Sequence, residues 1–139
     1  MPATWSLLAE LATRISVSYF AKGAPVSTDI LISLHPQHSA NILAGRKTVE
    51  LRRRPVRVSA GTRIWMYAKH PKSCIEGLAV VDRVCEAPLD ELWAEFGDQV
   101  GISKQDFDQY MKGMVIGCAI VLRSAEPLQR SIPLGEMRR

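Results

Sequence analysis

The chain has 139 residues, 47% of them hydrophobic, and a formal net charge of +4 at pH 7. This length and composition suit one folded domain with a hydrophobic core rather than an intrinsically disordered chain. The three cysteines, Cys74, Cys85 and Cys118, are well separated, which excludes a Cys-x-x-Cys zinc motif and argues against a disulfide framework.

The N-terminal segment predicts the first helix. Between residues 4 and 20 apolar side chains recur at helical spacing, namely Leu7, Leu8, Leu11 and Ile15. A run containing glycine and proline at residues 22–25 then ends the pattern. We therefore expect residues 1–26 to be an N-terminal helical appendage, which could contact an unknown partner protein, and residues 27–139 to be the domain.

The location of the protein is predicted from the same segment. No apolar stretch is long enough to span a bilayer. Glu10 and Arg14 interrupt the apolar residues near the N-terminus, and no basic leader precedes them. A secretory signal is therefore not indicated, and we expect a cytoplasmic protein that makes no membrane contact.

The domain begins with a strand and a short helix. Residues 29–34 are a strong strand candidate, and Pro36 is well placed to open a helix that ends near Gly45. His35 and His38 lie one helical turn apart, which metal sites can use, but no third ligand is close in sequence. We therefore expect no metal site, and nothing in the sequence indicates a cofactor.

The next strand carries the residues of most interest. Residues 48–52 alternate polar with apolar, which places Val49 and Leu51 toward the core. The polar side chains then share the opposite face, namely Thr48, Glu50 and Arg52. In this register Lys47 lies on the Val49 side, either reaching out from the edge of the core or sitting in a cleft where its pKa is lowered. Composition favours the edge, because most lysines are solvated.

Basic residues cluster around this strand. Six of the 18 lysines and arginines fall in one short window, namely Arg46, Lys47, Arg52, Arg53, Arg54 and Arg57. A cluster of this kind suits the phosphate backbone of a nucleic acid.

A second buried strand is expected at residues 62–68. Trp65, Tyr67 and Lys69 share one of its faces. Aromatic side chains beside a basic residue can stack a nucleobase, but aromatics in a strand more often belong to the core. The core interpretation is favoured for Trp65, and both interpretations stay open for Tyr67.

The remaining elements complete an α+β domain. We expect a strand over 74–86 with a bulge at Gly77, a helix from Pro88 to Gly97, a helix from Ser103 to Gly113, a strand over 114–122 and an edge strand in the tail 128–134. Strands with inserted helices, rather than regular alternation, predict a closed or nearly closed β-barrel. The motifs of nucleotide hydrolases, esterases and zinc proteases are absent from the sequence.

Several of these segments together resemble an ASCH domain of the PUA-like superfamily. They are Ile32-Ser33-Leu34-His35-Pro36, the pattern Gly-x-Lys-Thr-x-Glu-x-Arg from Gly45 to Arg52, the strand end Tyr67-Ala68, and residues 92–97. The resemblance covers about residues 29–133. It implies a PUA-like β-barrel with a cleft beside the first helix, lined by the Gly45 to Arg52 strand and holding single-stranded RNA or a nucleotide.

The family resemblance leaves three activities open. Some members are RNA-binding modules, some are ribonucleases, and one branch hydrolyses N4-acetylcytidine. In that branch the lysine matches Lys47, but the nucleophilic threonine position is occupied by Glu50, and the acidic residue has only Asp98 as a rough neighbour. A carboxylate cannot take over a hydroxyl's acyl-transfer role. The alternating register also puts Thr48, the nearest hydroxyl, on the other face from Lys47. The N4-acetylcytidine hydrolase activity is therefore the less favoured one. A protein-interaction role in transcription or translation regulation is a further alternative.

The candidate site follows from the strand and the resemblance together. Lys47 and Glu50 are the candidate catalytic residues, with Arg52 to offset charge on a phosphate and His35 or Tyr67 as an alternative acid or stacking surface. The alternative is that Glu50 and Arg52 only form an ion pair on a binding face. The candidate RNA- or nucleotide-binding residues are His35, Arg46, Lys47, Thr48, Glu50, Arg52, Arg53, Arg54, Tyr67 and Lys69.

Overall fold

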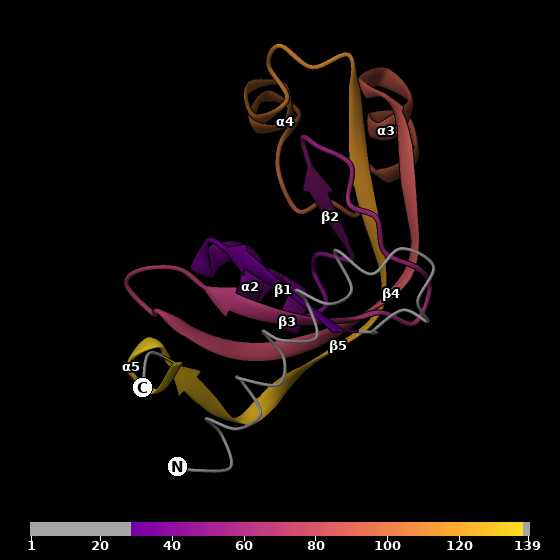
Figure 1. Ribbon diagram of the computed structural model, residues 1–139. Coiled ribbons are helices and arrows are strands. Elements are labelled where there is room, and N and C mark those ends of the chain that lie inside the picture. The colour runs from indigo at the N-terminus through magenta and orange to yellow at the C-terminus, as the bar shows by residue number, and fades with distance from the viewer. Residues whose placement is uncertain (1–28, 138–139) are drawn as a thin grey trace.

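The computed structural model describes residues 29–137, which form one five-stranded sheet with four short helices (Figure 1). In chain order the elements are β1 (Asp29–Leu34), α2 (Pro36–Leu43), β2 (Val49–Arg52), β3 (Arg63–Ala68), β4 (Cys74–Pro88), α3 (Leu89–Phe96), α4 (Lys104–Tyr110), β5 (Ile116–Pro133) and α5 (Leu134–Met137). The predicted helical appendage lies outside the described residues. Within residues 29–137 no helix is long and apolar enough to cross a membrane.

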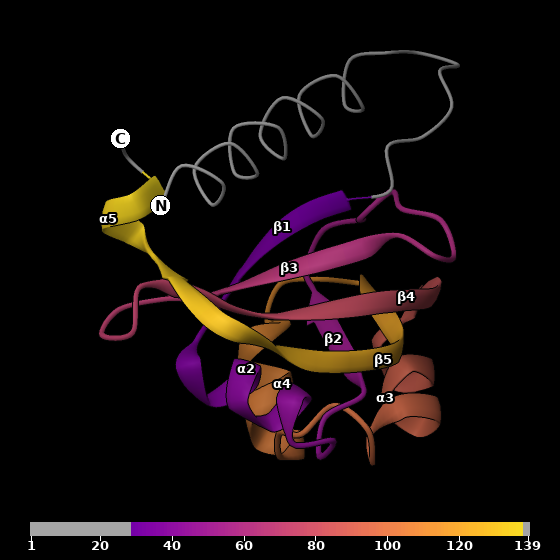
Figure 2. The same ribbon diagram turned by 90° about the horizontal axis from the view of Figure 1, so that it is seen from below.

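The short helices begin and end where local chemistry predicts. Pro36 occupies the first turn of α2, and Gly45 just beyond its end has φ of +79°, a conformation that glycine adopts without steric cost. Ser103 caps α4, because its Oγ accepts a hydrogen bond from the Asp106 backbone N–H at 3.1 Å. Figure 2 shows α2, α3 and α4 on the same side of the sheet.

The two longest strands, β4 and β5, hold the molecule together. They pair with each other from Cys74–Pro133 to Pro88–Ile116, and they run through both parts of the molecule seen in Figure 1. One buried cluster packs α2, β1 and β3 against these strands, with Ile32, Ile42 and Met66 among its members. A second packs β2, α3 and α4 against them, with Leu51 and Phe107 among its members. The two parts are therefore joined by a shared pair of strands.

Irregularities in the ladder bend these strands. The register shifts at Gly77, as expected for a bulge, and again around Val81. A Cβ at Gly77 would lie 2.6 Å from the terminal methyl groups of Leu43 and Met66, so a larger residue there would force both side chains to shift. The strand predicted for the tail 128–134 is present up to Pro133, and within residues 29–137 it pairs with β4 alone. It is not separate from the preceding strand, because the 15-residue β4 offers a continuous partner and residues 116–133 form a single strand.

The prediction was a closed or nearly closed β-barrel, and the sheet is not a closed barrel. Its strand order is β1-β3-β4-β5-β2, with β1 parallel to β3 and the other pairs antiparallel. Within the described part of the chain β1 and β2 therefore stand at opposite ends of the sheet. Where a barrel would close, the Ser33 carbonyl of β1 accepts a hydrogen bond from the Arg52 guanidinium of β2 at 3.1 Å. A side chain, rather than the backbone N–H of a neighbouring strand, therefore bonds the Ser33 carbonyl, and β1 and β2 do not pair with each other.

Candidate functional site

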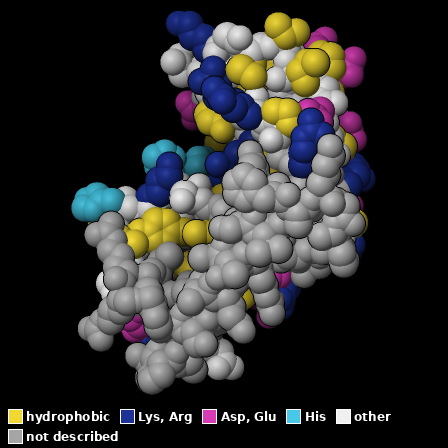
Figure 3. Space-filling view, viewed as in Figure 1, with side chains coloured by type: hydrophobic (Ala, Val, Ile, Leu, Met, Phe, Trp, Pro, Cys, Tyr) yellow, Lys and Arg dark blue, Asp and Glu magenta, His cyan; other side chains and the backbone are white. Residues whose placement is uncertain are grey.

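A cleft of about 500 Å³ lies between the two parts of the molecule. Figure 3 shows histidine and basic side chains gathered on one side, where the surface is hollowed. The cleft is lined by side chains from β1, α2, β2 and α4 and the loops beside them, namely Ser33, Leu34, His35, Gln37, His38, Lys47, Glu50, Leu51, Arg52, Lys69, Ile102, Asp106 and Tyr110. It therefore combines three cations with two carboxylates.

Lys47 is buried in the wall of this cleft, with only 3% of its surface exposed. Its backbone N–H donates to the Asn41 carbonyl at 3.1 Å, which ties it to the end of α2. A Cβ on Gly101 would lie 3.2 Å from the Lys47 Cβ, so the lysine stem packs closely on the loop after α3. The Lys47 ammonium donates to the Val100 carbonyl. The solvated position that composition favoured is therefore wrong.

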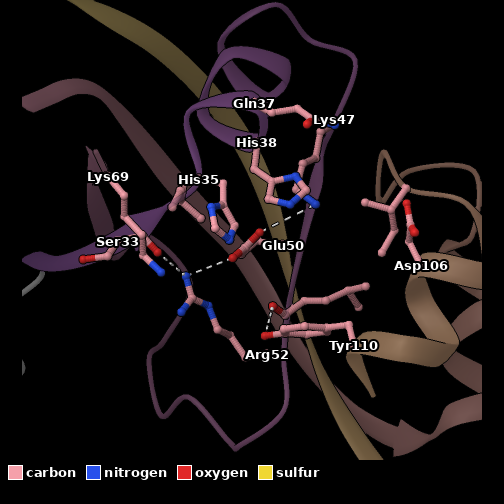
Figure 4. A pocket seen from close by; sticks show the side chains of 13 residues that line it. Ser33, His35, Gln37, His38, Lys47, Glu50, Arg52, Lys69, Asp106 and Tyr110 are labelled. Atoms are coloured by element: carbon pink, nitrogen blue, oxygen red, sulfur yellow. Dashed lines mark hydrogen bonds and ion pairs between the residues drawn. The ribbon is translucent and has the colours of Figure 1, made fainter. Parts of the chain in front are cut away.

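Glu50 lies between two cations. Its Oε1 is 3.6 Å from Lys47 Nζ, and its Oε2 is 2.9 Å from Arg52 Nη2 (Figure 4). The predicted separation of Lys47 and Glu50 onto opposite faces is wrong, because β2 begins only at Val49 and the strand alternation does not extend back to residue 47. Glu50 is thus in direct contact with both of the cations that were proposed to act with it.

Burial shifts the pKa of Lys47 and of Tyr110, both of which line the cleft. It lowers the pKa of Lys47, against the opposing effect of the Glu50 charge and with a further lowering by Arg52. It also raises the pKa of the Tyr110 phenol, which donates a hydrogen bond to the Leu51 carbonyl at 3.3 Å. Lys47 is therefore a stronger acid than an ordinary lysine, whereas the Tyr110 phenol stays neutral at pH 7.

His38 is the second group in the cleft whose pKa is lowered. Burial is the main cause, and the charges of Lys47, His35 and Arg52 add to it while Glu50 opposes them. The His38 Nδ1 is buried and has no hydrogen-bond partner within the described residues. The ring lies edge-on to His35, with 6.0 Å between the ring centroids. Burial and the nearby positive charges therefore both favour an uncharged His38 imidazole at neutral pH.

This lowered pKa predicts a pH dependence of stability. The folded protein binds a proton at His38 less readily than the unfolded chain, so stability should be fully present above an unfolded pKa near 6.5 and should fall as pH drops through it. Urea unfolding of the wild type and His38→Gln between pH 8 and pH 5 measures this. The free energy of unfolding should fall more steeply for the wild type, and parallel curves would contradict the prediction.

The cleft gathers half of the candidate binding residues. His35, Lys47, Glu50, Arg52 and Lys69 line it. The other five point elsewhere. Arg46 Nε donates to Asn41 Oδ1 at 3.2 Å, and Arg53 Nη2 donates to the Lys112 carbonyl at 3.1 Å. Thr48 Oγ1 lies 3.4 Å from Gln99 Oε1, Arg54 is exposed outside the cleft, and Tyr67 packs against the Trp65 cluster. Thr48, the hydroxyl nearest to Lys47 in sequence, is thus not a lining residue.

Sequence reasoning missed the far wall of the cleft. The sequence indicates Asp106 and Tyr110 only as parts of a helix, and its one suggestion for His38, a metal ligand, was not favoured. Tyr110 lies 60 positions after Glu50 in the chain, so no local spacing links them. The only available signal was the amphipathic pattern of α4, whose Phe107 is buried and whose other side faces the cleft. Among residues 29–137 no group of three or more histidine, cysteine and acidic side chains could hold a metal ion.

Comparison with known proteins places the chain in a family. Residues 29–137 match the model described as "Domain of unknown function (DUF365)". A protein of Zymomonas mobilis subsp. mobilis named "ASCH domain-containing ribonuclease" is 32% identical over 114 residues, which cover 82% of this chain and 76% of that protein.

Solved structures agree with this assignment. The crystal structure of ASCH from Zymomonas mobilis is similar with a TM-score of 0.75 and 32% identity, over 78% of this chain and 76% of that one. A point mutant of that protein gives a TM-score of 0.76 at 32% identity, over 81% and 79% of the two chains. The family model matches residues 29–137, which are more than half of the chain. The resemblance to an ASCH domain that was noted in the sequence is confirmed by these relatives. The chain belongs to the DUF365 family and is an ASCH domain protein.

Proposed function

We propose that this protein binds single-stranded RNA in the cleft and cleaves it there. The observation that carries the proposal is the buried Lys47 ammonium in contact with Glu50, which is itself paired with Arg52, at the wall of an open cleft. Perturbed titratable groups in a cleft favour catalysis over a purely structural ion pair. The name of the 32% identical relative, a ribonuclease, supports the same activity.

Binding would rest on the phosphates. Arg52 and Lys69 line the cleft and keep exposed surface, so their charges can meet successive phosphates of a single strand. Arg52 is held by Glu50 and by the Ser33 carbonyl, and its guanidinium is therefore oriented before RNA arrives. A pre-oriented arginine loses less side-chain entropy on binding a phosphate.

Cleavage would use the 2′-hydroxyl of the RNA itself. The Glu50 carboxylate accepts the 2′-hydroxyl proton, the 2′-oxygen forms a bond to phosphorus, and the bond from phosphorus to the 5′-oxygen breaks. The Lys47 ammonium gives its proton to the leaving oxygen, which its lowered pKa favours. Arg52 offsets the charge that develops on the phosphorane. The products are a 2′,3′-cyclic phosphate and a 5′-hydroxyl.

The test is an assay of end groups and binding together. Labelled single-stranded RNA should be cut to fragments with 2′,3′-cyclic phosphate and 5′-hydroxyl ends, and a strand with 2′-deoxy sugars should bind without being cut. Arg52→Ala should weaken binding about tenfold at low salt and reduce the dependence of affinity on salt, since one phosphate contact is lost. Arg46→Ala, outside the cleft, is the matched control and should leave cleavage unchanged.

Other outcomes would contradict this function. Binding that falls with salt but yields no product would make the protein an RNA reader rather than a nuclease. Release of acetate from N4-acetylcytidine, with RNA left intact, would support the amidohydrolase alternative. If neither RNA binding nor product is found, the proposal fails as a whole.

A further inference from the structure

Tyr110 presents an aromatic ring inside the cleft. It is 41% exposed, which makes it one of the few large apolar side chains within residues 29–137 that are not covered. Its hydroxyl donates to the Leu51 carbonyl at 3.3 Å and fixes the ring against β2 (Figure 4). The ring is therefore held in one place although part of its surface is open, which is the arrangement that a stacking platform needs.

Two apolar side chains and one acid complete this wall. Leu51 and Ile102 line the cleft together with Tyr110. Asp106 lies four residues before Tyr110 in α4, so both project from one face of the helix. Within residues 29–137 the Asp106 carboxylate makes no ion pair or hydrogen bond with another side chain. An unpaired carboxylate beside an open aromatic ring offers two acceptor oxygens to a ligand.

We propose that Tyr110 and Asp106 form a nucleobase subsite, in which the base stacks on the Tyr110 ring and its Watson–Crick edge donates to Asp106. The inference rests on the proposed RNA binding and specifies what that site reads. Arg52 contacts Glu50 and lies beside Tyr110, whose hydroxyl is bonded to the preceding residue of β2 (Figure 4), so the phosphate and the base of one nucleotide would be held by neighbouring side chains.

The Asp106 carboxylate selects among bases because it accepts hydrogen bonds and cannot donate one. Guanine presents two adjacent N–H donors on its Watson–Crick edge, which match both oxygens of a carboxylate. Uracil presents two carbonyl oxygens around one N–H, and these would face the negative charge of Asp106 unfavourably. The subsite therefore prefers guanine over uracil.

The experiment compares RNA pentamers that differ only at the central position, which carries guanine, uracil or no base. All sugars are 2′-fluoro, so that the 2′-oxygen attack cannot occur during a binding measurement. The wild type should bind the guanine pentamer about tenfold more tightly than the abasic one. Tyr110→Leu should lose that difference, whereas Tyr110→Phe should keep most of it, because the ring remains.

The role of Asp106 is tested in the same series. Asp106→Asn should keep the preference for a base over an abasic residue but lose about tenfold discrimination of guanine from uracil, since one acceptor becomes a donor. Equal wild-type affinity for all three pentamers would overturn the subsite while leaving RNA binding through phosphates intact. Absence of any salt-sensitive binding would overturn both the base subsite and RNA binding in the cleft. A guanine preference retained in Tyr110→Leu and Asp106→Asn would overturn the assignment of the subsite to these two residues.

Discussion

Replacing Lys47 with methionine should reduce the rate of RNA cleavage by about 10²- to 10⁴-fold, the range typical of losing a general acid. Methionine keeps an unbranched apolar stem against Gly101, where the Lys47 stem packs, but it carries no proton. The 5′-oxygen would then leave without a proton donor. Single-turnover cleavage of labelled RNA at saturating protein measures this rate separately from binding.

Lys69→Met is the matched control for Lys47→Met. Lys69 also lines the cleft but is exposed, so its loss should weaken RNA binding and leave the single-turnover rate at saturation within about threefold. Urea unfolding of both variants verifies that each is folded under the assay conditions. A Lys47→Met protein that is folded and cleaves at the wild-type rate would exclude Lys47 as the acid.

Replacing Glu50 with glutamine should destabilise the protein by about 2–3 kcal/mol at pH 7 as well as abolish cleavage. Among the described residues, Glu50 carries the only carboxylate that forms an ion pair with the Lys47 ammonium. The change removes this charge, while Lys47 stays 3% exposed. The expected cost is below that of a fully enclosed ion pair, because the Glu50 side chain keeps some contact with the cleft. Urea unfolding at pH 7 measures the change in the free energy of unfolding.

A double variant separates the lost ion pair from other effects. Combining Glu50→Gln with Lys47→Met removes both charges, so the double variant should be more stable than Glu50→Gln alone by about 1 kcal/mol or more. Neither catalytic group remains, and cleavage should stay absent. Additive losses of stability in the two single variants would mean that the two side chains do not interact in the folded protein.

The sequence by itself determined most of the secondary structure. β1 coincides with the predicted strand at 29–34, Pro36 opens α2, and Ser103 caps α4. These features are local, because side-chain periodicity, the fixed φ of proline and a capping hydroxyl act within a few residues. The family was accessible for the same reason, since the Gly45 to Arg52 pattern is one continuous stretch.

Only the tertiary structure decided which side chains meet. Lys47 reaches Glu50 because the loop after α3 buries its stem, although strand alternation placed the two apart. In the described part of the chain, the edges of β1 and β2 are linked only through the Arg52 side chain, which donates to the Ser33 carbonyl. Tyr110 enters the cleft because the buried Phe107 packs α4 against β2. Each outcome depends on contacts between residues distant in sequence, and periodicity along the chain carries no information about such contacts.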